Sequence, residues 1–289
     1  NEIRSVAPDL FAGQLQARRK NSHKGSYGSV GIIGGAPGMA GAALLTGRAA
    51  LQLGAGRVYL GMLERSLTVD PQQPELMLRT ADEVIALATC LAVGPGLGQS
   101  AAALMLLRRA IDSSLPLLLD ADALNLLAMH SVLMRKLSRR SAATLLTPHP
   151  AEAARLLGTN TEIVQADRLT AARELAKRYK ALVLLKGCGS IIALPDGRSF
   201  FNTTGNPGLA TAGSGDILSG FAVALLAQGW PAERALIAAT HLHGAAADEC
   251  VMNGTGPIGL SAGELIVPAR ALLNCWITES ANRAPVRRC

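Results

Sequence analysis

The sequence has 289 residues, of which 49% are hydrophobic and 17% are charged, and its formal net charge is +7. This length and composition support a sizeable core, which excludes a disordered protein. Aromatic residues make up only 3% of the chain, so little is available for stacking on single-stranded nucleic acid.

A positive net charge is compatible with nucleic acid, a membrane surface or a small anionic molecule as the partner. Short basic runs occur, such as Arg18-Arg19-Lys20, but no helical pattern has a continuously basic face. We therefore expect a solvated surface with a site for a small anionic molecule. Neither nucleic acid nor a membrane is expected as a partner.

The cysteine pattern indicates a reducing compartment, which we take to be the cytoplasm. The five cysteines form no C-x-x-C pair and are odd in number: Cys90, Cys188, Cys250, Cys275 and Cys289. No signal peptide is recognisable, and no apolar run reaches the ~18 residues that a membrane span needs. Because the first residue is Asn1 and not Met, the sequence is either trimmed or the later part of a longer protein.

Apolar runs typical of buried strands alternate with helical patterns along the chain. The order begins with a strand at 30–35, a helix at 40–53 that stops at Gly54, and a strand at 57–62. A strand within 90–98 leads into a Gly/Pro turn. Segments 115–127 and 143–158 each predict a strand followed by a helix, the second helix ending at Gly158.

Residues 181–201 predict a strand, a tight turn and a hairpin that bends at Pro195-Asp196-Gly197. A glycine-rich turn and two Ala-rich helices finish the predicted domain. The alternation predicts an α/β fold with an open, mostly parallel sheet and helices on both faces. We expect one domain over residues 1–289, with 1–29 and 277–289 as peripheral ends.

Six polar clusters follow the predicted strands, and ligands of such sheets bind beyond the carboxyl ends of the strands. The clusters are GGAPGMAG, GPGLG, DADALN, TPHPAE, KGCGS and AGSGD. Their common placement indicates a shared site more strongly than any one motif does. We expect them to gather at one edge of the sheet.

The cluster AGSGD predicts an anion site at the start of a helix. Gly213 and Gly215 allow a sharp turn, so that the amides of residues 213–215 can point at one anion. Asp216 beside that anion suits a base for a hydroxyl that attacks phosphorus. The alternative is that Asp216 only caps the helix, and this short motif alone does not separate the two.

The other clusters are less specific. The glycines of GGAPGMAG do not follow G-x-G-x-x-G, so they give a weak dinucleotide signal and a fair signal for close approach of backbone to a ligand. Asp120 and Asp122 could contact ribose hydroxyls or Mg²⁺-bound water, although Asp122 suits a helix cap equally well. His149 could donate to a phosphate or a substrate amide, but a single loop histidine is more often structural.

Two further candidates carry less weight. His241 and His243 are two residues apart in a helical pattern and therefore lie on different faces, which argues against a metal pair. Cys188 is more consistent with a small packing residue than with a nucleophile, because no base partner is evident.

As a set, the segments HKGSYG, GPGLGQ, DADALNLL, TPHPAEAARLLG and ATAGSGDILSG resemble the NAD(P)H-hydrate dehydratase family in sequence and spacing. The resemblance covers residues 21–248 and implies a ribokinase-like fold. It implies a substrate that is the 6-hydroxylated form of NADH or NADPH, called NADHX or NADPHX. It further implies phosphorylation of that hydroxyl by ADP in bacteria or ATP in eukaryotes, with Mg²⁺, and then elimination of phosphate.

The resemblance also assigns roles by residue. It implies that Asp216 activates the hydroxyl while Gly213, Ser214 and Gly215 stabilise the transferring phosphoryl group. Its implied substrate contacts are Ala42, Gly98, His149 and Asp216. The implied ADP site consists of Gly215 with Lys186, Gly187, Cys188, Gly189 and Ser190.

Three more expectations come from the family. Members are commonly homotetramers, and another common form is the later part of a bifunctional repair protein that also carries an NAD(P)H-hydrate epimerase. Related vitamin kinases have N-x-x-E before the Mg²⁺ site. Here the matching positions run from His149 to Glu152, which favours the dehydratase branch and gives Glu152 an indirect role at the metal.

Other functions share part of this pattern. A ribokinase-like kinase of a small alcohol, such as a vitamin precursor, would also use Asp216 and the anion site, but it would leave a stable phosphorylated product. A non-catalytic nucleotide-binding regulator would need no base. A Rossmann dehydrogenase is disfavoured by the irregular glycines and the carboxylates at the strand ends.

Overall fold

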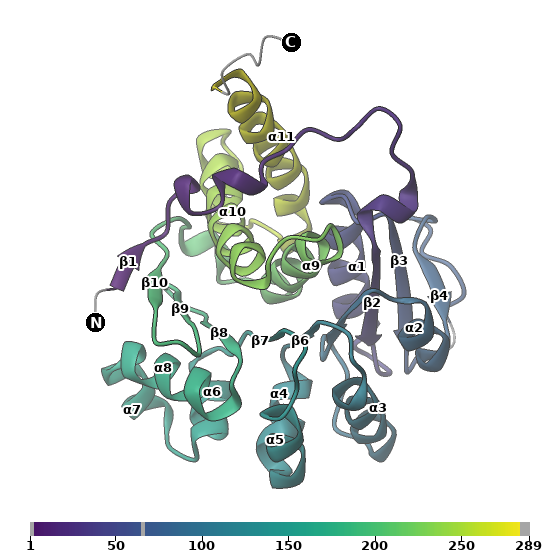
Figure 1. The fold of residues 1–289 in the computed structure, drawn as a ribbon, viewed down its shortest axis with the longest axis vertical. Coiled ribbons are helices and arrows are strands. Elements are labelled where there is room, and N and C mark those ends of the chain that lie inside the picture. Colours follow the sequence, from purple (N-terminus) through teal and green to yellow (C-terminus); the bar gives the residue numbers. More distant parts are fainter. Residues whose placement is uncertain (1–2, 65–66, 284–289) are drawn as a thin grey trace.

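The computed structural model describes residues 3–64 and 67–283, and these form one sheet flanked by two layers of helices (Figure 1). The strand order is β1-β10-β9-β8-β7-β6-β5-β2-β3-β4. The strands are β1 (Ile3–Ser5), β2 (Ser29–Gly34), β3 (Arg57–Met62), β4 (Met77–Arg79), β5 (Cys90–Val93), β6 (Leu117–Leu119), β7 (Thr144–Leu146), β8 (Leu182–Leu185), β9 (Ile191–Ala193) and β10 (Ser199–Phe201).

The helices of the described residues fill the connections between these strands and the C-terminal part of the chain. They are α1 (Ala40–Gln52), α2 (Ala81–Leu87), α3 (Ala101–Asp112), α4 (Asp122–Met129), α5 (Ser131–Leu137), α6 (Pro150–Leu157), α7 (Thr161–Ala166), α8 (Arg168–Tyr179), α9 (Ser214–Ala227), α10 (Ala232–Met252) and α11 (Ile266–Arg283). Short 3₁₀ helices cover Pro8–Leu10, Ala12–Gln14, Lys24–Tyr27, Pro207–Leu209 and Ala262–Leu265.

The strands β2 to β8 are parallel to their neighbours, and β9 alone runs antiparallel between β8 and β10. The carboxyl ends of the parallel strands therefore lie at one edge of the sheet. The predicted hairpin is present, since the Leu194 amide donates to the Arg198 carbonyl across the bend. The prediction of an α/β fold with a mostly parallel sheet is confirmed.

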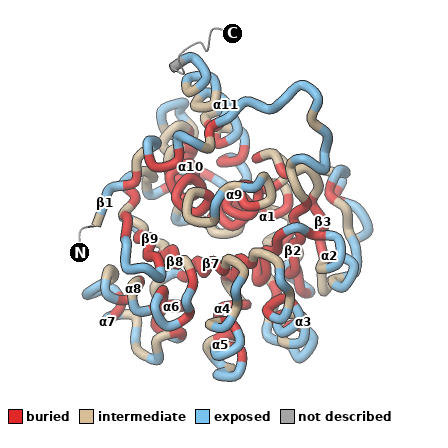
Figure 2. Tube along the Cα trace, viewed as in Figure 1, coloured by how far each residue is buried: buried red, intermediate tan, exposed pale blue. Residues whose placement is uncertain are grey.

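Each face of the sheet is covered by its own apolar core. Helices α1, α9, α10 and α11 pack on one face, and α2 to α8 pack on the other. Figure 2 shows the buried residues concentrated in the strands and in α9 and α10. Because both faces are covered, the strands are almost continuously apolar, as is usual for a parallel sheet.

Within the described part of the chain, no helix is long and apolar enough to cross a membrane.

Part of residues 1–29, which were expected to be peripheral, belongs to the sheet and the core. Strand β1 extends the sheet beside β10, and Phe11 is only 1% exposed. At the other end a third long helix, α11, follows the two that were predicted. Its buried residues Ile266, Ala269 and Leu273 are spaced three and four apart, a helical signal that the sequence analysis did not use.

Helices α1 and α9 approach each other closely at Gly220. A Cβ atom at this position would lie 2.5 Å from the Thr46 carbonyl oxygen and 2.6 Å from the Ala49 Cβ. These distances are shorter than van der Waals contact, so only glycine fits here. The contact sets the position of α9, and with it the position of the AGSGD turn at the start of α9.

We predict that Gly220→Ala lowers the free energy of unfolding by about 1–3 kcal/mol, the usual cost of overpacking a core. The matched control is Gly41→Ala in α1, where a Cβ would meet nothing within 4 Å. That variant should be neutral or slightly stabilising because alanine favours helices. Denaturant titration measures both variants, and equal effects would contradict this account of the α1–α9 contact.

Candidate active site

The loops after β2 and β5 meet where the order of the sheet reverses, which is the usual ligand position in such folds. The Gly35 amide donates to the Pro95 carbonyl at 3.0 Å, and the Ala36 amide donates to Gly96. A Cβ on Gly34 would lie 2.0 Å from the Pro95 carbonyl oxygen. The sequence analysis expected approach to a ligand at these glycines, but Gly34 is explained by contact between the two loops and Gly35 by its φ of +59°.

Two of the predicted substrate-binding residues flank this reversal point. Ala42 lies in the first turn of α1, and its Cβ would be 3.2 Å from a Cβ on Gly96. Gly98 has φ of +71°, and a Cβ there would lie 3.4 Å from Ala36. The Gly98 amide donates to Asp122 Oδ2 at 2.8 Å, which joins GPGLG to DADALN. Asp122 is the first residue of α4 and does not act as its N-cap, contrary to that alternative.

The helix α9 begins at Ser214 after Gly213, whose φ of 87° is in the left-handed region. Asp216 lies in the first turn and makes no capping hydrogen bond, so the alternative role as a cap is not observed. The first amides of a helix have no partner within it, and no side chain caps this end. The helix start therefore presents donors and a positive dipole end.

The turn residues differ in what they offer a ligand. The Ser214 hydroxyl lies 3.2 Å from His243 Nε2 in the interior, and the Ser214 amide makes a long hydrogen bond of 3.4 Å to the Thr211 carbonyl. Burial lowers the pKa of His243 to about 4, which keeps the ring neutral. Gly215 is helical, so the positive φ that requires glycine is at Gly213.

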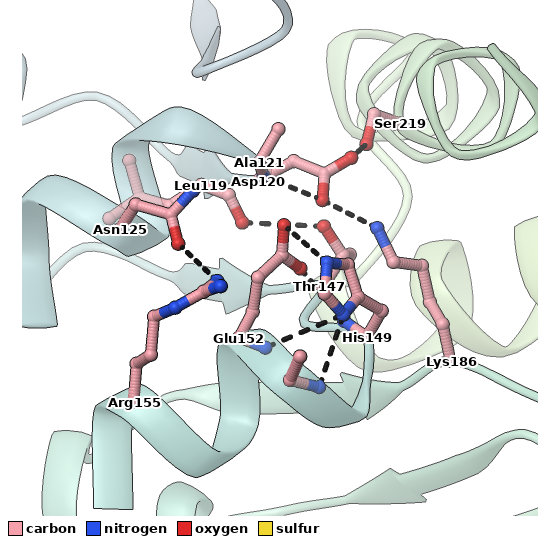
Figure 3. A network of polar contacts seen from close by, with 11 residues as sticks. Leu119, Asp120, Ala121, Asn125, Thr147, His149, Glu152, Arg155, Lys186 and Ser219 are labelled. Carbon is pink, nitrogen blue, oxygen red and sulfur yellow. Dashed lines mark hydrogen bonds and ion pairs between the residues drawn. The ribbon is translucent and has the colours of Figure 1, made fainter. Parts of the chain in front are cut away.

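Asp120, at the end of β6, is the centre of a hydrogen-bond network (Figure 3). Its side chain is buried, and Oδ1 lies 2.7 Å from Lys186 Nζ. The Ala121 amide also donates to Oδ1, and the Ser219 hydroxyl donates to Oδ2 at 2.7 Å. A Cβ on Gly215 would lie 3.2 Å from Lys186 Nζ, which places the ammonium against the first turn of α9.

Ser219 was missed by the sequence analysis. It lies in the middle of α9, with no exposed surface, and follows Asp216 by one helical turn. A hydroxyl within the apolar stretch that follows Asp216 is the signal that could have revealed it, because a buried polar group needs a partner.

The buried charges shift one another's pKa values. Burial and the nearby Asp120 carboxylate raise the pKa of Asp216 to about 7, against the opposing effect of Lys186. Burial alone would lower the pKa of Lys186, but Asp120 and Glu152 outweigh it and raise that pKa above its usual value. Lys186 therefore favours its charged form, while Asp216 keeps its proton to a much higher pH than an exposed aspartate does.

His149 caps α6, which is the structural role that the sequence analysis weighed against substrate contact. Its Nδ1 accepts hydrogen bonds from the amides of Ala151 and Glu152, which leaves the proton on Nε2. Glu152 Oε2 accepts from the His149 amide at 2.8 Å, and Oε1 lies 3.3 Å from His149 Nε2. About half of the His149 side chain remains exposed.

Glu152 is 4% exposed, and burial raises its pKa to about 7. Both of its oxygens already have partners, so a role at a metal would have to be through water. Among the residues that the structure describes, no group of three His, Cys, Asp or Glu side chains could hold a metal ion. Asp120 also has a partner on each oxygen, and Asp122 Oδ2 accepts from the Gly98 amide, so these carboxylates fit a Mg²⁺ ion that keeps its waters, as Mg²⁺ commonly does.

The KGCGS turn follows β8 and carries Lys186 into the network. Gly187 and Gly189 have φ of +139° and +62°, conformations that favour glycine. The Ser190 hydroxyl donates to the Gly187 carbonyl, which closes the turn, and Cys188 is exposed. The four described cysteines are free thiols, and Cys289 lies outside the described residues. Contacts thus connect the predicted nucleotide turn to the start of α9.

Comparison with known proteins gives a consistent result. The model of the NAD(P)H-hydrate dehydratase family matches residues 30–266. The chain is 44% identical, over 270 residues and 91% of each protein, to the ADP-dependent (S)-NAD(P)H-hydrate dehydratase of Neisseria meningitidis. It is 39% identical over 298 residues to the bifunctional NAD(P)H-hydrate repair enzyme of Escherichia coli, and it spans 56% of that relative's length.

Among solved structures, the ADP/ATP-dependent NAD(P)H-hydrate dehydratase of Bacillus subtilis, co-crystallised with ATP/Mg²⁺, matches with a TM-score of 0.83. The two sequences are 28% identical, and the match covers 95% of this chain and 99% of the other. The fold is therefore ribokinase-like, as the resemblance implied. Together with the family match over most of the sequence, this shows that the chain belongs to the NAD(P)H-hydrate dehydratase family.

Proposed function

We propose that this protein catalyses the ADP-dependent dehydration of (S)-NADHX and (S)-NADPHX to NADH and NADPH, a repair of damaged cofactors. The observation that carries the proposal is Asp216, a carboxylate with a pKa of about 7 in the first turn of α9. A base with this pKa suits proton removal at neutral pH. The relative from Neisseria meningitidis, which bears the name of this activity, supports the same reaction.

In the proposed first step, Asp216 takes the proton of the substrate's 6-hydroxyl while that oxygen attacks the terminal phosphorus of ADP. The bond to the bridging oxygen breaks, and AMP leaves. The amides of residues 213–215 and the Lys186 ammonium would stabilise the transferring phosphoryl group, and the closeness of Lys186 Nζ to Gly215 at the start of α9 supports this role. This chemistry needs positioning and charge neutralisation more than covalent participation by the protein.

In the second step the bond between C6 and oxygen breaks, and phosphate departs with the bonding electrons. The nicotinamide ring loses a proton and regains its double bond. Phosphate is a far better leaving group than hydroxide, which is the reason for using ADP at all. When bound, Mg²⁺ would neutralise phosphate charge, with Asp120, Asp122 and Glu152 acting through its bound water.

The proposed substrate site consists of Ala42, Gly98, His149 and Asp216, of which Ala42 and Gly98 flank the reversal point of the sheet. The proposed ADP site consists of the turn from Lys186 to Ser190 together with Gly215. The contact between Gly215 and Lys186 supports this assignment, because it brings the turn that would bind ADP to the first turn of α9, which carries Asp216.

The proposed activity is tested by incubating NADHX with the protein, Mg²⁺ and either ADP or ATP. Absorbance of the reduced nicotinamide should return with ADP, and a mixture of epimers should react completely only when an NAD(P)H-hydrate epimerase is added. A stable phosphorylated product would indicate a kinase. Nucleotide binding with no turnover would indicate a regulator.

We predict that Asp216→Asn lowers turnover by roughly 10²–10⁴-fold, the usual contribution of a general base. ADP binding should persist, and the melting temperature should not fall, because the amide removes a buried charge. In the wild type, kcat/KM should rise with pH up to about 7, where Asp216 loses its proton. A variant that keeps more than about a tenth of the rate would refute the assignment of Asp216 as the base.

We also propose a cytoplasmic homotetramer, on the strength of the family resemblance. Most of the Ala-rich helix α10 is buried within the chain, so it offers little surface to another subunit. A better candidate surface is the group of exposed side chains Met105, Met129 and Val132 on α3, α4 and α5. Light scattering should give four times the 29.9 kDa chain mass, and a monomer mass would exclude the assembly. Cell fractionation tests the location.

A further inference from the structure

Arg168, the first residue of α8, lies behind the KGCGS turn and has no part in the function proposed above. Its Nη1 donates to the Cys188 carbonyl at 2.5 Å. Its Nη2 lies 3.3 Å from the carbonyl oxygens of both Leu185 and Lys186. One guanidinium therefore holds three of the four consecutive carbonyls from the end of β8 into the turn.

The surroundings of this guanidinium show that it is built into the turn. A Cβ on Gly187 would lie 2.9 Å from Arg168 Nη2, so the turn passes directly over the charged group. Arg168 Nε is buried without a hydrogen-bond partner, and no carboxylate within the described residues forms a salt bridge with the side chain. The carbonyl oxygens are therefore the groups that stabilise its charge.

This arrangement matters for a turn that is to meet a phosphate. A peptide turn exposes carbonyl oxygens as well as amides, and those oxygens repel an anion. A guanidinium that binds three of them holds them on its own side of the turn and compensates their dipoles. The opposite side of the turn is then free for an anionic ligand.

Lys186 is fixed by other contacts as well. Its amide donates to the Pro148 carbonyl at 2.8 Å, and its ammonium pairs with Asp120 at 2.7 Å. Loss of Arg168 should therefore release the part of the turn beyond Lys186 while leaving the charge network around Asp120 in place. A variant at Arg168 should therefore change the binding of ADP, the phosphoryl donor, without changing the chemical step.

We propose that Arg168 is a positioning residue for the phosphates of the nucleoside diphosphate, acting through the shape of the turn at residues 185–188. This inference rests on the proposed function, because that function places ADP at the turn. Arg168 would touch neither substrate nor phosphate directly. Its role is to keep the turn in the one conformation that accepts them.

The test compares Arg168→Lys with the wild type by steady-state kinetics and by calorimetric titration with ADP and Mg²⁺. A lysine ammonium lacks the planar fork needed to hold all three carbonyls. The KM and the Kd for ADP should rise about tenfold or more, which corresponds to losing one charge-assisted hydrogen bond. The KM for NADHX and the kcat at saturating ADP should stay within about threefold.

Two further variants sharpen the test. Lys177→Ala removes an exposed positive charge from the same helix and should change neither constant. Gly187→Ala disturbs the turn from its other side, by pressing a methyl group against Arg168 Nη2, and should raise the KM for ADP even if the lysine variant folds poorly.

The outcomes are distinguishable. A Kd for ADP within twofold of the wild type in both the Arg168→Lys and Gly187→Ala variants would overturn the inference and leave the proposed function intact. Parallel losses in both KM values and in melting temperature would also overturn it, since they indicate a merely structural role. If the wild type neither binds ADP nor restores NADH, the proposed function itself fails.

Discussion

One buried ion pair determines how the strand-end loops are arranged. Asp120 is 1% exposed, and an isolated carboxylate there would be very costly, so Lys186 must be held within 2.7 Å of it. A buried pair of this kind adds little net stability, because desolvation offsets the attraction. Its contribution is to geometry. The Asp120 carboxylate after β6 and the Lys186 ammonium after β8 must meet beside the buried face of α9. The Ser219 hydroxyl completes this meeting of three elements.

The other contacts of the site extend the same arrangement outward. Asp122 binds the Gly98 amide and so couples the β5 and β6 loops, while the neighbouring Ala121 has φ of 49°, an uncommon value outside glycine. His243 holds the Ser214 carbonyl and hydroxyl, which ties the beginning of α9 to α10. Two groups thus fix the start of α9: the Lys186 ammonium, which lies against Gly215, and the neutral imidazole of His243, which contacts Ser214. Such support on several sides is what a positioned base and anion site require.

The sequence predicted the fold well where the signal is local. The apolar run at 57–62 coincides with β3, and parallel strands necessarily bring their following loops to one edge. Prediction from the sequence failed where the role of a residue depends on a partner that is distant in the chain. Ser219 has meaning only through Asp120, which is 99 residues away, and Arg168 only through carbonyls on another element. His149 was ambiguous for a different reason, since both of its roles start from the same loop position and only the direction of Nδ1 decides that it caps α6.

The elevated pKa values of Asp216 and Glu152 link folding to proton concentration. Each pKa is about 7 in the folded chain, whereas an unfolded carboxyl titrates near 4, so between these values the native state binds more protons than the unfolded state. The stability that protonation supplies is complete below about pH 4 and is lost as the pH rises through 7. The free protein is therefore under most electrostatic strain at the pH where Asp216 becomes an active base. Cations that enter with the nucleotide would relieve that strain, so ligand binding favours the charged form of the site that proton release creates.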